Sequence, residues 1–178
     1  VFGVAFTCAF FQNPALIGDD GITPARNVLQ EAERVGQERR QRRLEWRETL
    51  ASRKGPMIRR LRNAIGRFID SHPRLLQLRE VWWDRRDRAG RPITSLLWLA
   101  RDRSHLNRWL NGIALVGLSA SVAVFLKGAA NVPLMLTLWL CQRSLMAVGG
   151  PWYGFGWEPQ LAEIGFHTLF LVPLLSLN

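Results

Sequence analysis

Charged side chains are almost absent from the last third of this 178-residue chain. From residue 111 to the end, the charged residues are Lys127, Arg143, Glu158 and Glu163. In contrast, 22 of the 24 basic and 10 of the 14 acidic residues lie between positions 26 and 108, so that segment carries +12 and the remainder −2. A soluble domain usually mixes charged and apolar residues along its length, so this segregation indicates a chain that divides between water and a membrane.

Cysteine and the common catalytic motifs are also scarce. The chain has Cys8 and Cys141, each inside an apolar run, which favours buried thiols over a disulfide framework. It has no Gly-x-Ser-x-Gly elbow, no P-loop and no His-Glu-x-x-His, so hydrolase, nucleotide-binding and zincin functions lack support. We therefore predict a protein that is not an enzyme and that needs no cofactor or metal.

The apolar residues 1–11 do not resemble a signal peptide. The first residue is Val1, and no basic region precedes the apolar run. We expect this stretch to be the end of a truncated transmembrane helix.

The segment 109–148 is predicted to form a hairpin of two transmembrane helices. Residues 111–126 contain no charge, and with two more residues they reach about 27 Å as a helix, close to the hydrocarbon thickness. Trp109 and Lys127 suit the two membrane interfaces. Asn131 suits an N-cap and Pro133 a first helical turn, so a second helix should follow after a tight connection.

The segment 149–178 is predicted to contain an interfacial turn and a third membrane helix. Residues 149–157 (GGPWYGFGW) hold four Gly, one Pro and four aromatic residues, which excludes a regular helix and favours the lipid headgroup zone. A helix should restart at 158–159, with Pro159 at its first position, and continue over 160–177 with a bend near Pro173. We expect this third membrane helix to be truncated at the end of the chain.

The segment 12–108 is predicted to be an extramembrane loop that contains a basic insert. Turn-forming residues fill 13–25, and a short helix over 26–35 follows, with Thr23 as N-cap. An amphipathic basic helix over 57–69 and a short helix over 75–83 favour binding to an anionic membrane surface over binding to nucleic acid, since nothing else specifies a groove. The positive-inside rule weakens for so long a loop, so its side of the membrane stays open. The fold class is thus all-α, with polytopic membrane helices and an Arg-rich helical extramembrane insert.

Two stretches resemble the lipase maturation factor family. Residues 12–26 (QNPALIGDDGITPAR) resemble the loop after that family's first membrane helix, and 149–173 resemble its most characteristic stretch. The segment 34–91 has no counterpart in the pattern. The residues that carry the resemblance are Gly18, Asp19, Gly21, Pro24, Trp152, Tyr153, Phe155, Gly156, Trp157, Glu158, Gln160, Leu161, Glu163, Gly165 and Phe166.

This resemblance implies a multi-pass protein of the endoplasmic reticulum membrane. The family assists the folding and assembly of secreted dimeric lipases in a chaperone-like role and is not a hydrolase. The implied partners are membrane lipid and a lipase client, with no nucleic acid. Two alternatives remain, a multi-helix membrane enzyme with converging intramembrane ionisable groups and a structural lipid-binding module.

The ionisable residues near the apolar helices have simpler structural explanations. Glu163 and His167 are four residues apart on one helix face, which favours hydrogen bonding over an incomplete metal site. We expect Arg143 to form an intramembrane ion pair with Glu158 or Glu163. Turn formation explains the aspartates at 19–20, and an interfacial belt explains the aromatic cluster.

Overall fold

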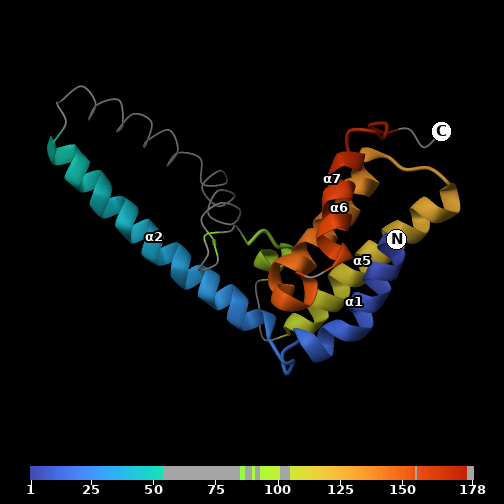
Figure 1. The fold of residues 1–178 in the computed structure, drawn as a ribbon, viewed down its shortest axis with the longest axis horizontal. Helices are drawn as coiled ribbons and strands as arrows, with labels where there is room; N and C mark the ends of the chain where they lie inside the picture. The colour runs from blue at the N-terminus through green and yellow to red at the C-terminus, as the bar shows by residue number, and fades with distance from the viewer. Residues whose placement is uncertain (54–84, 87–89, 91–92, 101–104, 155, 176–178) are drawn as a thin grey trace. The chain divides into compact units, whose positions relative to one another are not determined.

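The structure is a computed structural model that describes residues 1–53, 85–86, 90, 93–100, 105–154 and 156–175. These residues form an all-α fold, as predicted, and they fall into two compact units, Val1–Leu29 with Ser95–Asn178, and Gln30–Thr94. The helical elements (Figure 1) are α1 (Phe2–Leu16), α2 (Ala25–Arg53), the 3-10 turn η2 (Leu96–Leu99), α5 (Leu106–Lys127), α6 (Val132–Gly149), the 3-10 turn η3 (Gly150–Tyr153) and α7 (Trp157–Thr168).

The core of the first unit is the packing of α1 along α5, which lie side by side (Figure 1). The ring of Phe6 is fully buried and lies where a Cβ on Gly117 would be. A Cβ on Gly3 would lie 3.1 Å from the Ser121 hydroxyl oxygen, which is a tight contact without overlap. Small residues on α5 therefore let the two helices approach closely.

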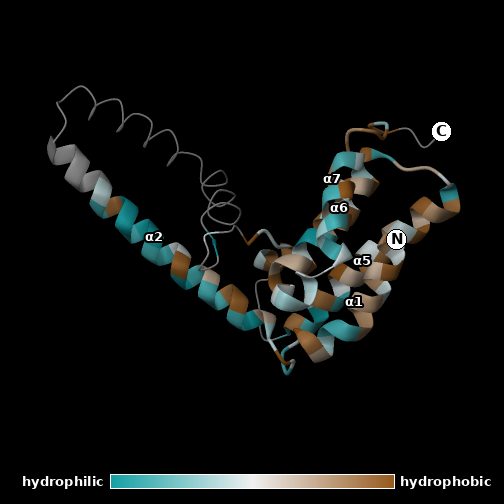
Figure 2. Ribbon diagram, viewed as in Figure 1, coloured by the Kyte–Doolittle hydropathy of each residue, from teal (hydrophilic) through white to brown (hydrophobic). Residues whose placement is uncertain are grey.

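The predicted hairpin is formed by α5 and α6. α5 (Leu106–Lys127) and the continuous stretch of α6 with η3 (Val132–Tyr153) are each long and apolar enough to cross a membrane. α5 is mostly brown and tan in the hydropathy colouring, whereas α2 is mostly teal (Figure 2). Asn131 caps α6 as predicted, because its Oδ1 accepts a hydrogen bond from the Leu134 N–H at 3.1 Å.

Two helix boundaries differ from the sequence-based expectation. α1 continues to Leu16 and includes Pro14, so the turn-rich loop is shorter than expected. α7 ends at Thr168, and its 12 residues reach about 18 Å, well short of the hydrocarbon core. The chain turns after it, and the Val132 N–H donates to the Pro173 carbonyl at 3.0 Å. The helix expected over 160–177 therefore stops early, and the segment after it pairs with the start of α6 instead.

The second unit contains most of α2, which was expected to end near residue 35 and instead continues to Arg53. Ion pairs one helical turn apart join Arg34 to Glu31 and Glu38, at 3.1 and 4.0 Å. Such pairs stabilise a polar helix by a few tenths of a kcal/mol each. The helices predicted over 57–69 and 75–83 lie outside the described residues.

Candidate functional site: the junction of the two motifs

The two stretches that resemble the family, residues 12–26 and 149–173, are called here the first and the second motif. The loop of the first motif folds back onto the end of α1. The Ile22 and Thr23 N–H groups of the loop donate to the Ala15 and Leu16 carbonyls at the end of α1, at 3.1 and 2.9 Å. The N–H of Ala25, the first residue of α2, donates to the carbonyl of Ile17, the C-cap of α1, at 2.9 Å. The last carbonyls of a helix have no partner within it, so the loop satisfies groups that would otherwise need water. α1, the loop and the start of α2 thus form one hydrogen-bonded segment.

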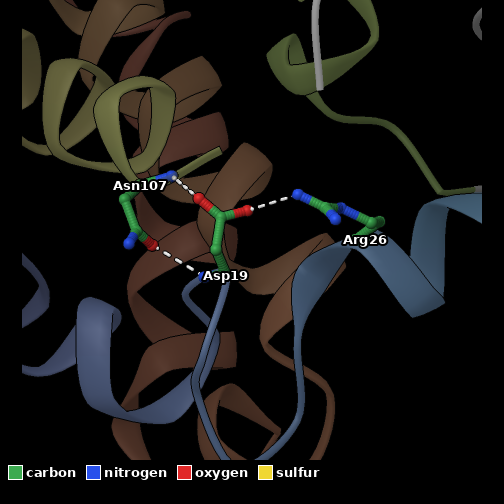
Figure 3. A network of polar contacts seen from close by, with 3 residues as sticks. All are labelled: Asp19, Arg26 and Asn107. Atoms are coloured by element: carbon green, nitrogen blue, oxygen red, sulfur yellow. Dashed lines mark hydrogen bonds and ion pairs between the residues drawn. The ribbon is translucent and has the colours of Figure 1, made fainter. Parts of the chain in front are cut away.

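Asp19 caps the N-terminus of α5 from a distant part of the sequence. The residue at the N-cap position, His105, makes no side-chain capping bond. Instead, the Asp19 Oδ2 accepts from the Asn107 N–H at 3.2 Å, and the Asn107 Oδ1 accepts from the Asp19 N–H at 2.8 Å (Figure 3). The Asp19 Oδ1 also pairs with the Arg26 guanidinium at 2.9 Å. A carboxylate is favoured at a helix N-terminus, so Asp19 has a tertiary role beyond the turn that the sequence indicates.

The glycines of the first motif are required by close packing. A Cβ on Gly18 would overlap the Pro14 carbonyl and the Asn107 amide oxygen. A Cβ on Gly21 would lie 2.8–2.9 Å from backbone atoms of Leu16, Ile17 and Gly18. Rigid backbone surrounds both positions, so any larger residue would displace the loop from α1 and α5.

The second motif binds the first through two aromatic side chains. The buried Tyr153 hydroxyl donates to the Asn13 Oδ1 at 2.6 Å. The half-exposed Trp152 indole donates to the Thr23 hydroxyl at 2.8 Å. Thr23 was expected to cap α2, but its hydroxyl instead donates to the Leu16 carbonyl, at 3.2 Å. Two stretches that are more than a hundred residues apart therefore meet as one junction, which we call the motif junction.

The turn between η3 and α7 depends on a further glycine. Gly156 has φ +84°, a conformation that side chains disfavour. Trp157 begins α7, and Glu158 lies in its first turn, where the helix dipole favours a negative charge. Pro159 was expected to be the first residue of this helix, but it is the third. Phe155 lies outside the described part of the chain.

The remaining motif residues pack α7 against the bundle or face outward. The Trp139 indole donates to the Ala162 carbonyl at 2.9 Å, and its ring lies 5.6 Å from that of Phe166. A Cβ on Gly165 would lie 2.8 Å from the ring of Phe2. Leu161 is buried, whereas Gln160 and Glu163 are exposed.

The ionisable residues singled out from the sequence lie at several places in the first unit. Asp19 belongs to the motif junction, Arg143 is half-buried on α6, and Glu163 and His167 are exposed on α7. The Glu158 Oε2 is buried without a hydrogen-bond partner. The ion pair between Arg143 and Glu158 or Glu163 stays a prediction. Among the residues that the structure describes, no three His, Cys, Asp or Glu side chains gather as a metal site would require.

Sequence reasoning missed several residues of this region. Asn13 and Asn107 read as ordinary turn and helix-start residues, and only the folded chain brings them to Tyr153 and Asp19. Ser144 was also missed, although it accepts from the Leu96 N–H at 2.9 Å and so holds η2 against α6. A polar residue within an apolar helix was the available signal in the case of Ser144.

Comparisons with known proteins show which family the chain is similar to. The family described as "Lipase maturation factor transmembrane domain" matches residues 1–60 and 71–178. Lipase maturation factor 1 of Bos taurus is 35% identical over 178 residues, which is 100% of this chain and 24% of that protein. The proteins of the same name from Homo sapiens and Mus musculus are each 34% identical over the whole chain and 23% of their own length. No solved structure matches significantly.

The comparisons also correct one expectation. The segment 34–91 was taken to have no counterpart in the family, yet the match includes all but residues 61–70. The chain spans about a quarter of the length of these relatives, 23–24%. With the match over nearly all of its residues and two helices of membrane-spanning character, the chain belongs to the lipase maturation factor family and corresponds to its transmembrane domain.

Proposed function

We propose that this chain is the membrane-anchored part of a chaperone-like factor that assists the folding and assembly of secreted lipases. It acts without catalysing a reaction, in the membrane of the endoplasmic reticulum, as a multi-pass protein. The observation that carries the proposal is the chain-long similarity to proteins named as lipase maturation factors.

The motif junction supplies the structural part of the proposal. Its polar groups are directed at one another: Tyr153 at Asn13, Trp152 at Thr23, and the Asp19 carboxylate at α5. This arrangement suits a rigid support better than a reaction centre, where side chains would converge on a substrate. We infer that the junction holds the helices in the geometry from which the rest of the protein acts on its client.

A chimera tests the proposal. The aligned segment of the bovine relative is replaced by this chain and expressed with a secreted lipase in cells that lack their own maturation factor. We expect secreted lipase activity to rise above that of cells without the chimera, with lipase mRNA unchanged. If the chimera inserts into the membrane at normal abundance and lipase activity stays at background, the proposed function is wrong.

Variants separate the role of the junction from the role of abundance. Tyr153→Phe removes the hydroxyl that donates to Asn13, whereas Trp157→Phe removes an exposed indole elsewhere in the same motif. We expect the first variant to lower lipase activity more than the second, at matched chimera levels. Equal activity of the two variants would contradict a function for the junction.

The location is tested by N-glycosylation mapping. An Asn-x-Thr acceptor placed in the connection between α5 and α6, at residues 128–131, is modified only if that connection faces the lumen. A second acceptor beyond α7 reports its own side. Loss of sensitivity to a glycosidase specific for immature glycans would argue against residence in the endoplasmic reticulum.

A further inference from the structure

A groove of about 370 Å³ opens along one face of α5. It is lined by Leu96, Leu99, Arg108, Trp109, Gly112, Ile113, Val116 and Cys141. The α5 residues recur at intervals of three and four, so they form a single stripe on the helix. From residue 108 to residue 116 the stripe is about 12 Å long. The size and the mostly apolar lining are those of a ligand pocket.

Arg108 provides the charged group of the groove. It is exposed and lies two residues after the first residue of α5, next to Trp109, which is 39% exposed. The neighbouring Asp19 carboxylate is already shared between Asn107 and Arg26, so Arg108 keeps its charge available. Within the described ranges no carboxylate forms an ion pair with Arg108.

We propose that this groove binds one anionic phospholipid, with an acyl chain along α5 and the headgroup at Arg108. α5 has the length and composition of a membrane span, so its Arg108 end lies at an interface and the groove runs from there toward the hydrocarbon. A lipid matches this order of groups, because its anion sits at the interface and its chain extends inward. An apolar protein segment would fill the groove but would leave the arginine without a partner. The inference concerns a ligand and is independent of the lipase-directed function.

Gly112 allows the groove to be filled without disturbing the fold. A Cβ at this position meets nothing within 4 Å, so a larger side chain extends into the groove. Phe also has a higher helix propensity than Gly, so Gly112→Phe should not weaken α5. Leu115→Phe is the matched control, since Leu115 is exposed on the same helix and is not part of the groove lining.

Arg108→Gln removes the charge, and Lys127→Gln is its matched control at the opposite end of α5. Both positions are exposed and both variants lose one positive charge. An interfacial cation contributes enough to anionic lipid binding that its loss should weaken affinity about fivefold.

Native mass spectrometry of the full chain in neutral detergent measures this binding, with phosphatidylserine and phosphatidylcholine of identical acyl chains as probes. We expect phosphatidylserine to bind more tightly, Arg108→Gln to weaken it about fivefold and to leave phosphatidylcholine unchanged. We expect Gly112→Phe to weaken both lipids by on the order of tenfold because the acyl chain loses its space. Both controls should stay within twofold of the unmodified chain.

Three results would overturn the proposal. Equal affinity for the two lipids would remove the role of charge, and equal effects of Arg108→Gln and Lys127→Gln would remove the site. A change from dimer to monomer in Gly112→Phe, with lipid binding unaltered, would assign the groove to a second copy of the chain. Circular dichroism of each variant confirms that it is folded before binding is compared.

Discussion

Asp19→Ala is expected to destabilise the first unit, since its carboxylate caps α5 from outside that helix. The substitution removes the acceptor for the Asn107 N–H and the partner of Arg26. Because His105 provides no capping bond, nothing within the described residues replaces the lost acceptor. The Asn107 N–H in the first turn of α5 would then depend on water as its acceptor.

The expected magnitude follows from the geometry. Loss of an N-cap acceptor costs about 1 kcal/mol, and a charged acceptor at 18% exposure raises this toward about 2 kcal/mol. The Arg26 pair adds little, about 0.5 kcal/mol or less, because the guanidinium is 39% exposed and solvent screens it. We therefore expect a loss of about 1.5–2.5 kcal/mol for Ala. Asp19→Asn keeps an acceptor and should cost about half of that.

Titration with SDS in neutral detergent micelles, followed by circular dichroism, measures the free energy of unfolding. The matched control is Asp20→Ala, which changes the neighbouring exposed aspartate in the same turn and should alter stability by less than about 0.5 kcal/mol. The order of stability should be unmodified chain, then Asn, then Ala at position 19. If the Ala variants at 19 and 20 are equally stable, the capping argument is refuted.

Three further changes test the packing of the same unit. Tyr153→Phe should lower the free energy of unfolding by about 1–3 kcal/mol, because the Asn13 amide oxygen stays buried without its donor. In the same titration, the double variant with Asn13→Leu should recover part of this loss. Gly149→Ala should lower the free energy of unfolding by about 1–3 kcal/mol, because its methyl group would overlap the Tyr153 ring. Gly112→Ala is the control, and in the same titration it should be neutral or stabilising by about 0.5–1 kcal/mol. Ser144→Ala should cost about 1–2 kcal/mol and expose η2 to limited proteolysis, since the first N–H of that turn loses its acceptor.

The sequence predicted best those structural features that depend only on residues within one helix or at its ends. Residues 111–126 lie within the single helix α5, Asn131 caps α6, and α6 ends at Gly149, the first glycine of the predicted break. These features are local and the structure confirms them, although α5 is longer than the predicted run, over Leu106–Lys127. Hydrophobic run length, capping chemistry and glycine conformation act over a few residues, so they can be read directly from the chain.

Expectations failed where distant segments compete with local preference. Residues 13–16 read as a loop because of Pro14, yet α1 continues through them, and loop N–H groups satisfy its last carbonyls. The run 160–177 reads as one helix by hydropathy, but the chain turns after Thr168 and pairs with the start of α6. Tertiary hydrogen bonds outweigh the weak intrinsic preferences of such short stretches.

The sequence by itself determined that the chain is helical, that α5 and α6 are apolar enough to cross a membrane, and that its motifs are those of the lipase maturation factor family. Only the tertiary structure decided that the two motifs meet, that Asp19 caps α5, and that a groove with one arginine runs along that helix. The physical reason is range: helix formation depends on neighbours in sequence, whereas caps, buried hydrogen bonds and grooves depend on residues that only folding brings together.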